Sequence, residues 1–60
     1  METVTFNVYT KPHGKGDILT VEAELTANLL TYLTTFKNES ITYKGFMDLA
    51  NRTNLEYKIL

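Results

Sequence analysis

The sequence of 60 residues contains no cysteine, so no disulfide bond can stabilise its fold. It contains only one histidine, and its seven acidic residues are scattered, which offers no spacing typical of a metal site. A domain of this length buries only about 60% of the surface that its unfolded chain exposes, and oligomerisation is a common source of added stability. We therefore expect a single domain over residues 1–60 that binds no cofactor and forms a homodimer.

The sequence also has little net charge, because six Lys and Arg residues nearly balance seven Asp and Glu residues. Binding to nucleic acids depends on clustered cations, so this balance disfavours a nucleic-acid partner, and it equally disfavours an acidic mimic of DNA. No apolar run approaches the roughly 18 residues that a membrane span requires. The first residues lack a basic region followed by an apolar stretch, so no secretory signal is visible and we expect a cytoplasmic protein without membrane contact.

The first third of the sequence predicts a β-hairpin. Polar and apolar residues alternate over Thr3–Tyr9, which predicts a strand ending near Thr10 with Val4, Phe6 and Val8 on its buried face. Residues 11–17 hold the single proline and two of the three glycines, which is typical of a hairpin loop. Residues 17–23 then predict a second strand with Leu19, Val21 and Ala23 on its inner face. A helix that starts in this region with Thr20 as its N-cap is the alternative interpretation.

The remaining sequence predicts a helix and further strands. Apolar residues at helical spacing predict a helix over about 25–37, with Lys37 in its last turn and Asn38 as its cap. A brief strand over 41–43, a weaker helical pattern over 45–53 and a clearly alternating strand over 55–60 follow. The order β-β-α-β-(α)-β predicts an α+β fold, a small antiparallel sheet with one main helix packed on it. In outline this order resembles the compact β-grasp-like and ββαβ architectures.

The hairpin loop holds the residues with the greatest potential for chemistry. Gly14, Lys15 and Gly16, flanked by Lys11 and His13, could form an anion cradle, but a solvated hairpin loop is the interpretation that we favour. His13 is the only side chain whose ordinary pKa lies near neutrality, and catalysis would require a rigidly held partner for it. The sequence offers no such partner, no metal set and no phosphate loop, so we expect a protein that is not an enzyme.

The C-terminal segment suggests an alternative function. Ala50, Asn54 and Leu55 match the spacing of the first part of a helix-turn-helix over residues 46–60, with Leu60 where a second helix would be anchored. The segment offers only Arg52 and Lys58 as cations. A small DNA-binding transcriptional regulator is therefore the alternative hypothesis.

Exposed aromatic and apolar residues favour a protein partner instead. Tyr9 falls on the polar face of the first strand, and Lys58 and Leu60 face outward if the last strand buries Leu55, Tyr57 and Ile59. We expect a protein-binding module that docks on a larger intracellular protein and inhibits or modulates it. Its length matches many inhibitors of host machinery encoded by phages or mobile elements, including counter-defence factors. The candidate contact residues are Tyr9, Lys11, His13, Lys15, Tyr43, Lys58 and Leu60.

Overall fold

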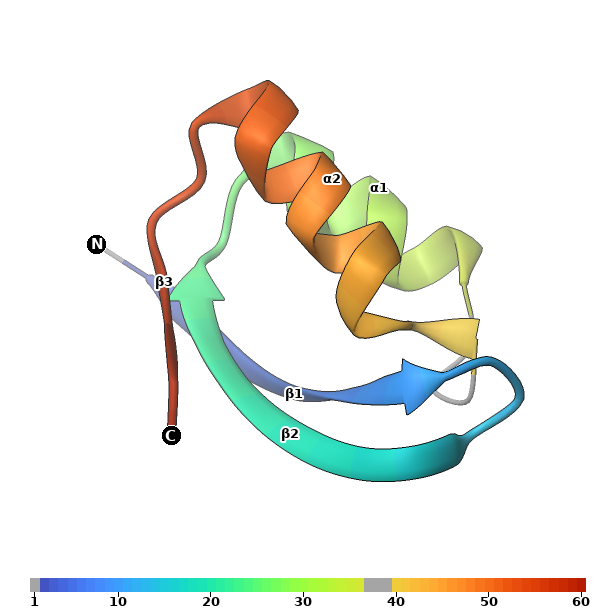
Figure 1. Ribbon diagram of the computed structural model, residues 1–60. Helices are drawn as coiled ribbons and strands as arrows, with labels where there is room; N and C mark the ends of the chain where they lie inside the picture. The colour runs from blue at the N-terminus through green and yellow to red at the C-terminus, as the bar shows by residue number, and fades with distance from the viewer. Residues whose placement is uncertain (1, 37–39) are drawn as a thin grey trace.

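The computed structural model describes residues 2–36 and 40–60. Two long strands, β1 (Thr3–Lys11) and β2 (Lys15–Glu24), form a hairpin, and two helices follow, α1 (Ala27–Thr35) and α2 (Tyr43–Thr53). The last strand, β3 (Tyr57–Ile59), completes an antiparallel sheet of order β1-β2-β3. The hairpin curves strongly, and both helices lie on its concave side (Figure 1). The predicted α+β class with a small antiparallel sheet is confirmed.

A tight turn joins the first two strands. The N–H of Lys15 donates to the carbonyl of Pro12 over 3.3 Å. His13 and Gly14, the two central residues, have φ angles of 62° and 72°, the combination that characterises a type I′ turn. The predicted hairpin loop is therefore present, and the strands extend slightly further toward it than predicted.

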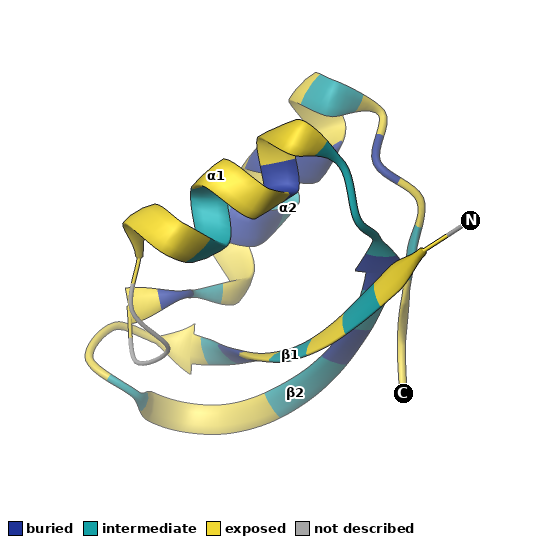
Figure 2. Cartoon of the chain, turned by 180° about the vertical axis from the view of Figure 1, so that it is seen from behind, coloured by how far each residue is buried: buried dark blue, intermediate teal, exposed yellow. Residues whose placement is uncertain are grey.

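The hairpin register places one apolar face under the helices. Val4, Phe6 and Val8 lie opposite Ala23, Val21 and Leu19, so the predicted alternation is confirmed in both strands. The alternative in which a helix starts near Thr20 is wrong. Buried residues lie where the sheet and the helices face each other (Figure 2). The core consists of Val8, Val21, Ala23, Leu29, Ile41, Phe46, Leu49, Ala50 and Leu55.

The first helix is shorter than the apolar spacing predicted. It begins after Thr26, whose Oγ1 accepts a hydrogen bond from the N–H of Leu29 over 3.1 Å. It ends at Thr35, and Phe36 has extended backbone angles and a side chain that is 42% exposed. The predicted end at Lys37 and cap at Asn38 lie outside the described residues.

The second helix is longer than predicted, and it replaces a predicted strand. Residues 41–43 form only an isolated bridge between Thr42 and Tyr9. The hydroxyl of Thr42 accepts a hydrogen bond from the N–H of Gly45 over 3.1 Å, so the helix begins at Tyr43. Two helices of similar length therefore cover the sheet, where one main helix was predicted. Within the described residues, neither helix is long enough and apolar enough to span a membrane.

Candidate protein-binding surface

Strand β2 has an open edge beyond the end of β3. The three residues of β3 pair only with Val21–Ala23 of β2. The N–H of Leu60 adds a hydrogen bond to the carbonyl of Thr20 over 2.9 Å, and the pairing stops there. Among the described residues, no strand lies beside β2 from Lys15 to Leu19 on this side.

The backbone of Ile18 faces this open edge. In an antiparallel pair, residues alternate between those that exchange hydrogen bonds with the partner strand and those whose backbone groups point away from it. The bonds from Leu25 to Glu2 and from Leu60 to Thr20 fix this alternation along β2. Ile18, which lies opposite Tyr9, therefore belongs to a pair without mutual hydrogen bonds, and its N–H and C=O point outward.

Apolar side chains surround the open edge. Of the six large apolar side chains that are exposed among the described residues, three lie here: Ile18 is 58% exposed, Ile59 44% and Leu60 65%. Leu19 points to the opposite face of the sheet from Ile18 and is half-buried. We call Ile18, Leu19, Ile59 and Leu60 the apolar corner.

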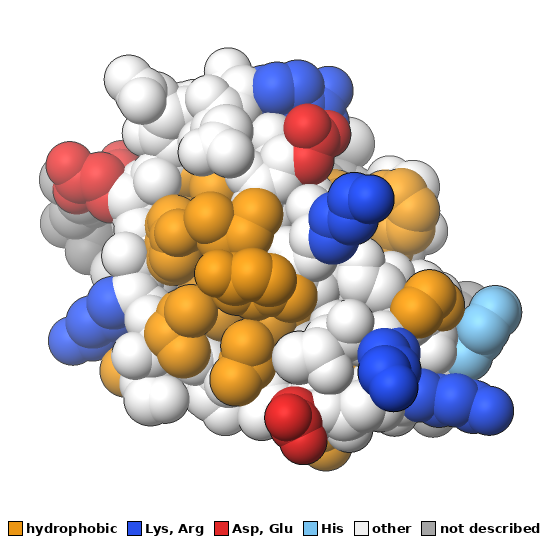
Figure 3. Space-filling model, in the orientation of Figure 1, with side chains coloured by type: hydrophobic (Ala, Val, Ile, Leu, Met, Phe, Trp, Pro, Cys, Tyr) orange, Lys and Arg blue, Asp and Glu red, His pale blue; other side chains and the backbone are white. Residues whose placement is uncertain are grey.

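Further apolar side chains continue this surface toward α2. Tyr57 follows the inner face of β3, and its hydroxyl donates a hydrogen bond to the sulfur of Met47 over 3.2 Å. Both residues are half-buried and pack against the core. Apolar side chains gather into one patch between α2 and the sheet (Figure 3). Contiguous apolar patches that remain exposed mark interaction sites more often than scattered apolar residues do.

The outer face of the sheet is polar away from this corner. The hydroxyl of Thr20 donates to the side-chain oxygen of Asn7 over 3.2 Å, and Lys58 forms an ion pair with Glu22 at 3.6 Å. Next to that ion pair lies a shallow pocket of about 250 Å³, to which Glu24 and Glu56 also contribute. The outer face therefore resembles the solvated side of an antiparallel sheet that is covered on one side only.

The structure separates the predicted contact residues into four places. Leu60 lies in the apolar corner. Lys58 is exposed on the outer face, where the prediction placed it. Lys11, His13 and Lys15 are exposed around the hairpin turn, and Tyr9 lies half-buried on the outer face. Tyr43 begins α2, apart from the other three places.

Sequence reasoning missed three residues of the corner, Ile18, Leu19 and Ile59. The same alternation that placed Leu19 on the inner face implies that Ile18 faces outward, so its exposure was readable from the sequence. Ile59 was predicted to be buried, which is wrong, because it is 44% exposed. It does face the inner side of the sheet, opposite Val21, but β3 is the edge strand.

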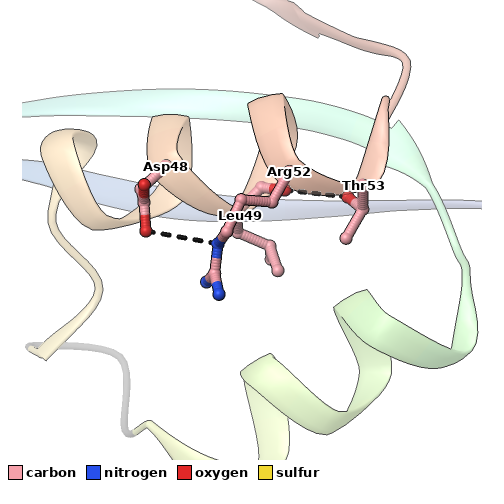
Figure 4. A network of polar contacts seen from close by, with 4 residues as sticks. All are labelled: Asp48, Leu49, Arg52 and Thr53. Atoms are coloured by element: carbon pink, nitrogen blue, oxygen red, sulfur yellow. Dashed lines mark hydrogen bonds and ion pairs between the residues drawn. The ribbon is translucent and has the colours of Figure 1, made fainter.

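The predicted helix-turn-helix lacks its second helix. Asn54 adopts the left-handed conformation, with φ 57° and ψ 39°, and Ala50 and Leu55 are buried, as such a turn requires. The following residues, however, form β3 and not a helix. Both cations of this segment are paired with carboxylates, since Arg52 lies 3.3 Å from Asp48 and Lys58 pairs with Glu22. In Figure 4 the Arg52 pair lies beside the hydrogen bond from the Thr53 hydroxyl to the carbonyl of Leu49.

Two aromatic side chains pack against each other at the C-terminal end of α1. Tyr32 and Phe36 contact each other with 4.9 Å between ring centroids. Burial raises the pKa of the Tyr32 hydroxyl, because the charged phenolate is disfavoured away from water.

Comparison with known proteins adds no relatives: no protein-family model, no curated protein and no solved structure matches this chain. Over residues 2–36 and 40–60, no group of three or more His, Asp or Glu side chains is placed to hold a metal ion.

Proposed function

We propose that this chain is a non-enzymatic protein-binding module that docks through its apolar corner on a larger cytoplasmic protein and inhibits or modulates it. The observation that carries the proposal is the position of three exposed apolar side chains around an open sheet edge, Ile18 and Leu60 on its outer face and Ile59 on its inner face.

Burial of the corner supplies the free energy of docking. Complete burial of one Leu or Ile side chain contributes about 1.5–3 kcal/mol. Interfaces typically concentrate their binding energy in a few such central side chains, which polar residues surround. Here the polar surroundings are Lys15 on one side and the Lys58–Glu22 ion pair on the other. A module of this kind inhibits by covering a working surface of its partner, as expected for an inhibitor encoded by a phage or mobile element.

Affinity capture with paired variants tests the proposal. The tagged protein is immobilised, lysate of the organism that encodes it is applied, and the retained protein is identified, purified and titrated against each variant. Leu60→Asp replaces one exposed apolar side chain of the corner with a charged one. Leu30→Asp is the matched control, because Leu30 is 52% exposed on α1, away from the corner.

The two variants give opposite expectations. Leu60→Asp should weaken binding of the purified partner about tenfold or more, since it places a charge where an apolar group is buried. Leu30→Asp should leave the affinity within about twofold of wild type. Equal effects of both variants would refute the assignment to the corner. Retention of duplex DNA alone, with affinity falling steeply as salt rises, would support the DNA-binding alternative.

A further inference from the structure

We infer that the open edge of β2 takes up an extended, acidic segment of the partner as a fourth strand of the sheet. This inference rests on the proposed function, because it names the part of the partner that the apolar corner receives.

The backbone groups of the edge determine the shape of the occupant. The N–H and C=O of Ile18 point away from β1, and β3 ends before it reaches them. An exposed strand edge of this kind is a template for another strand, and extended peptides bind many domains by adding to such an edge. The free stretch from Lys15 to Leu19 spans about 16 Å, enough for one short peptide strand in line with β3.

The side chains around the edge determine the apolar positions of the occupant. Ile18 lies on the outer face of the sheet and Leu19 on the inner face. Successive side chains of an added strand also alternate between the two faces. Leu60 and Ile59 extend the same two faces at the end of β3. A bound segment therefore meets apolar surface on both of its sides, next to the edge and at the end of β3.

The charge at the hairpin determines the sign of the charge on the occupant. Lys11 and Lys15 lie directly opposite each other, an arrangement that is unfavourable for two like charges. The ion pairs among the described residues are Arg52–Asp48 and Lys58–Glu22, and neither includes these lysines. In Figure 3 the cationic side chains at this end lie beside the pale blue side chain of His13, the single histidine. Asp17 is the one carboxylate of residues 11–17, so the two lysines leave this end of the hairpin with an excess of positive charge. A carboxylate at the end of an added strand would relieve the repulsion between the two lysines.

A pair of designed peptides tests the inference. The probe is a peptide of about eight residues in which valine and threonine alternate and which ends in two glutamates; the control ends in two lysines. Each peptide is titrated into ¹⁵N-labelled protein, and the amide resonances of Leu19 and Leu60 report binding. The glutamate peptide should bind with at least about tenfold higher affinity than the lysine peptide, and Lys15→Glu should reverse the preference.

A backbone variant separates strand addition from simple apolar contact. Ile18→Pro removes the outward N–H but no hydrogen bond between β1 and β2, and proline is tolerated at such edge positions. Ile18→Val is the matched control. Ile18→Pro should lower the affinity for the glutamate peptide about tenfold more than Ile18→Val does. If Ile18→Pro does not fold, amide hydrogen exchange at Ile18 in the wild-type protein replaces it; saturation with the peptide should slow this exchange at least about tenfold.

The results that would overturn the inference are distinct from failure of the proposed function. No binding of the glutamate peptide at millimolar concentration, equal affinity of the two Ile18 variants or unchanged exchange at Ile18 would each overturn it. Self-association that Ile18→Pro abolishes would show that a second copy of the chain occupies the edge, and would also overturn it. If Leu60→Asp still weakens binding of the captured partner, docking at the corner stands and only strand addition fails.

Discussion

The rings of Phe46 and Tyr57 pack edge to face with 5.3 Å between their centroids, and this contact joins α2 to β3. Phe46 is completely buried and makes a second edge-to-face contact with Phe6 of β1, also at 5.3 Å. A strand of three residues gains little from its own hydrogen bonds. The position of β3, and with it Ile59 and Leu60, therefore depends on this aromatic contact.

Truncation at Phe46 should accordingly be among the most damaging changes in the chain. Phe46→Ala should lower the free energy of unfolding by about 3–5 kcal/mol, enough to unfold much of so small a domain. Phe46→Leu, which loses both ring contacts but keeps an apolar side chain, should cost about 1–3 kcal/mol. Tyr57→Phe keeps the ring and is the control, with an expected cost below about 1 kcal/mol. Urea denaturation measures all three; a Phe46→Ala protein as stable as wild type would show that this packing is wrong.

The glycine at the start of β2 should resist substitution. Gly16 has a φ of 78°, and a Cβ atom at this position would overlap the hydroxyl of Thr10. That hydroxyl also accepts a hydrogen bond from the N–H of Asp17 over 2.8 Å. Gly16→Ala should therefore lower the free energy of unfolding by about 1–3 kcal/mol. In a Thr10→Ala background the cost of Gly16→Ala should be smaller, because the overlap is gone; an unchanged cost would assign the whole effect to the backbone angle.

Alkaline pH should destabilise the fold through Tyr32. Burial raises the pKa of this hydroxyl above its ordinary value of 10.0, so the folded protein retains a proton that the unfolded chain releases. The free energy of unfolding should therefore fall as pH rises above about 10. Tyr32→Phe cannot lose this proton and should show a shallower decline when both proteins are denatured in urea across this range. If the free energy of unfolding of the two proteins falls in parallel with pH, the raised pKa of Tyr32 is contradicted.

The homodimer predicted from the chain length stays a prediction with a direct test. If the chain dimerises, its thermal midpoint should rise with protein concentration, because association stabilises the folded state by mass action. Since we assign the β2 edge to a partner, Ile18→Pro should leave this dependence unchanged. A midpoint independent of concentration, together with a monomeric mass by light scattering, would exclude the dimer.

The hairpin was predictable because its determinants are local. Alternation at period two places Val4, Phe6 and Val8 on one face, and Gly14 readily adopts one of the two positive φ angles of the turn. The start of α2 was not predictable in the same way. Ile41 and Tyr43 are typical strand residues, which favoured a strand at this point of the sequence. In the structure Ile41 is buried, and its carbonyl accepts a hydrogen bond from the N–H of Tyr9 over 2.9 Å. That contact joins residues far apart in the sequence, and no local pattern reveals it.

The apolar corner was predictable only in part. Leu60 and the outward direction of Ile18 follow from alternation along their strands. The exposure of Ile59 does not, because it depends on β3 being the short edge strand of the sheet. Local alternation specifies which face a side chain takes, whereas tertiary packing decides whether anything covers that face.

The most direct test of the central claim is a methyl-resonance footprint of the partner on this protein. The partner purified by capture is added to protein labelled at the methyl groups of isoleucine and leucine. We predict that the resonances of Ile18, Leu19, Ile59 and Leu60 shift or broaden and that those of Leu30 do not. A footprint centred on Leu30, with Ile18 and Leu60 unchanged, would contradict docking through the apolar corner.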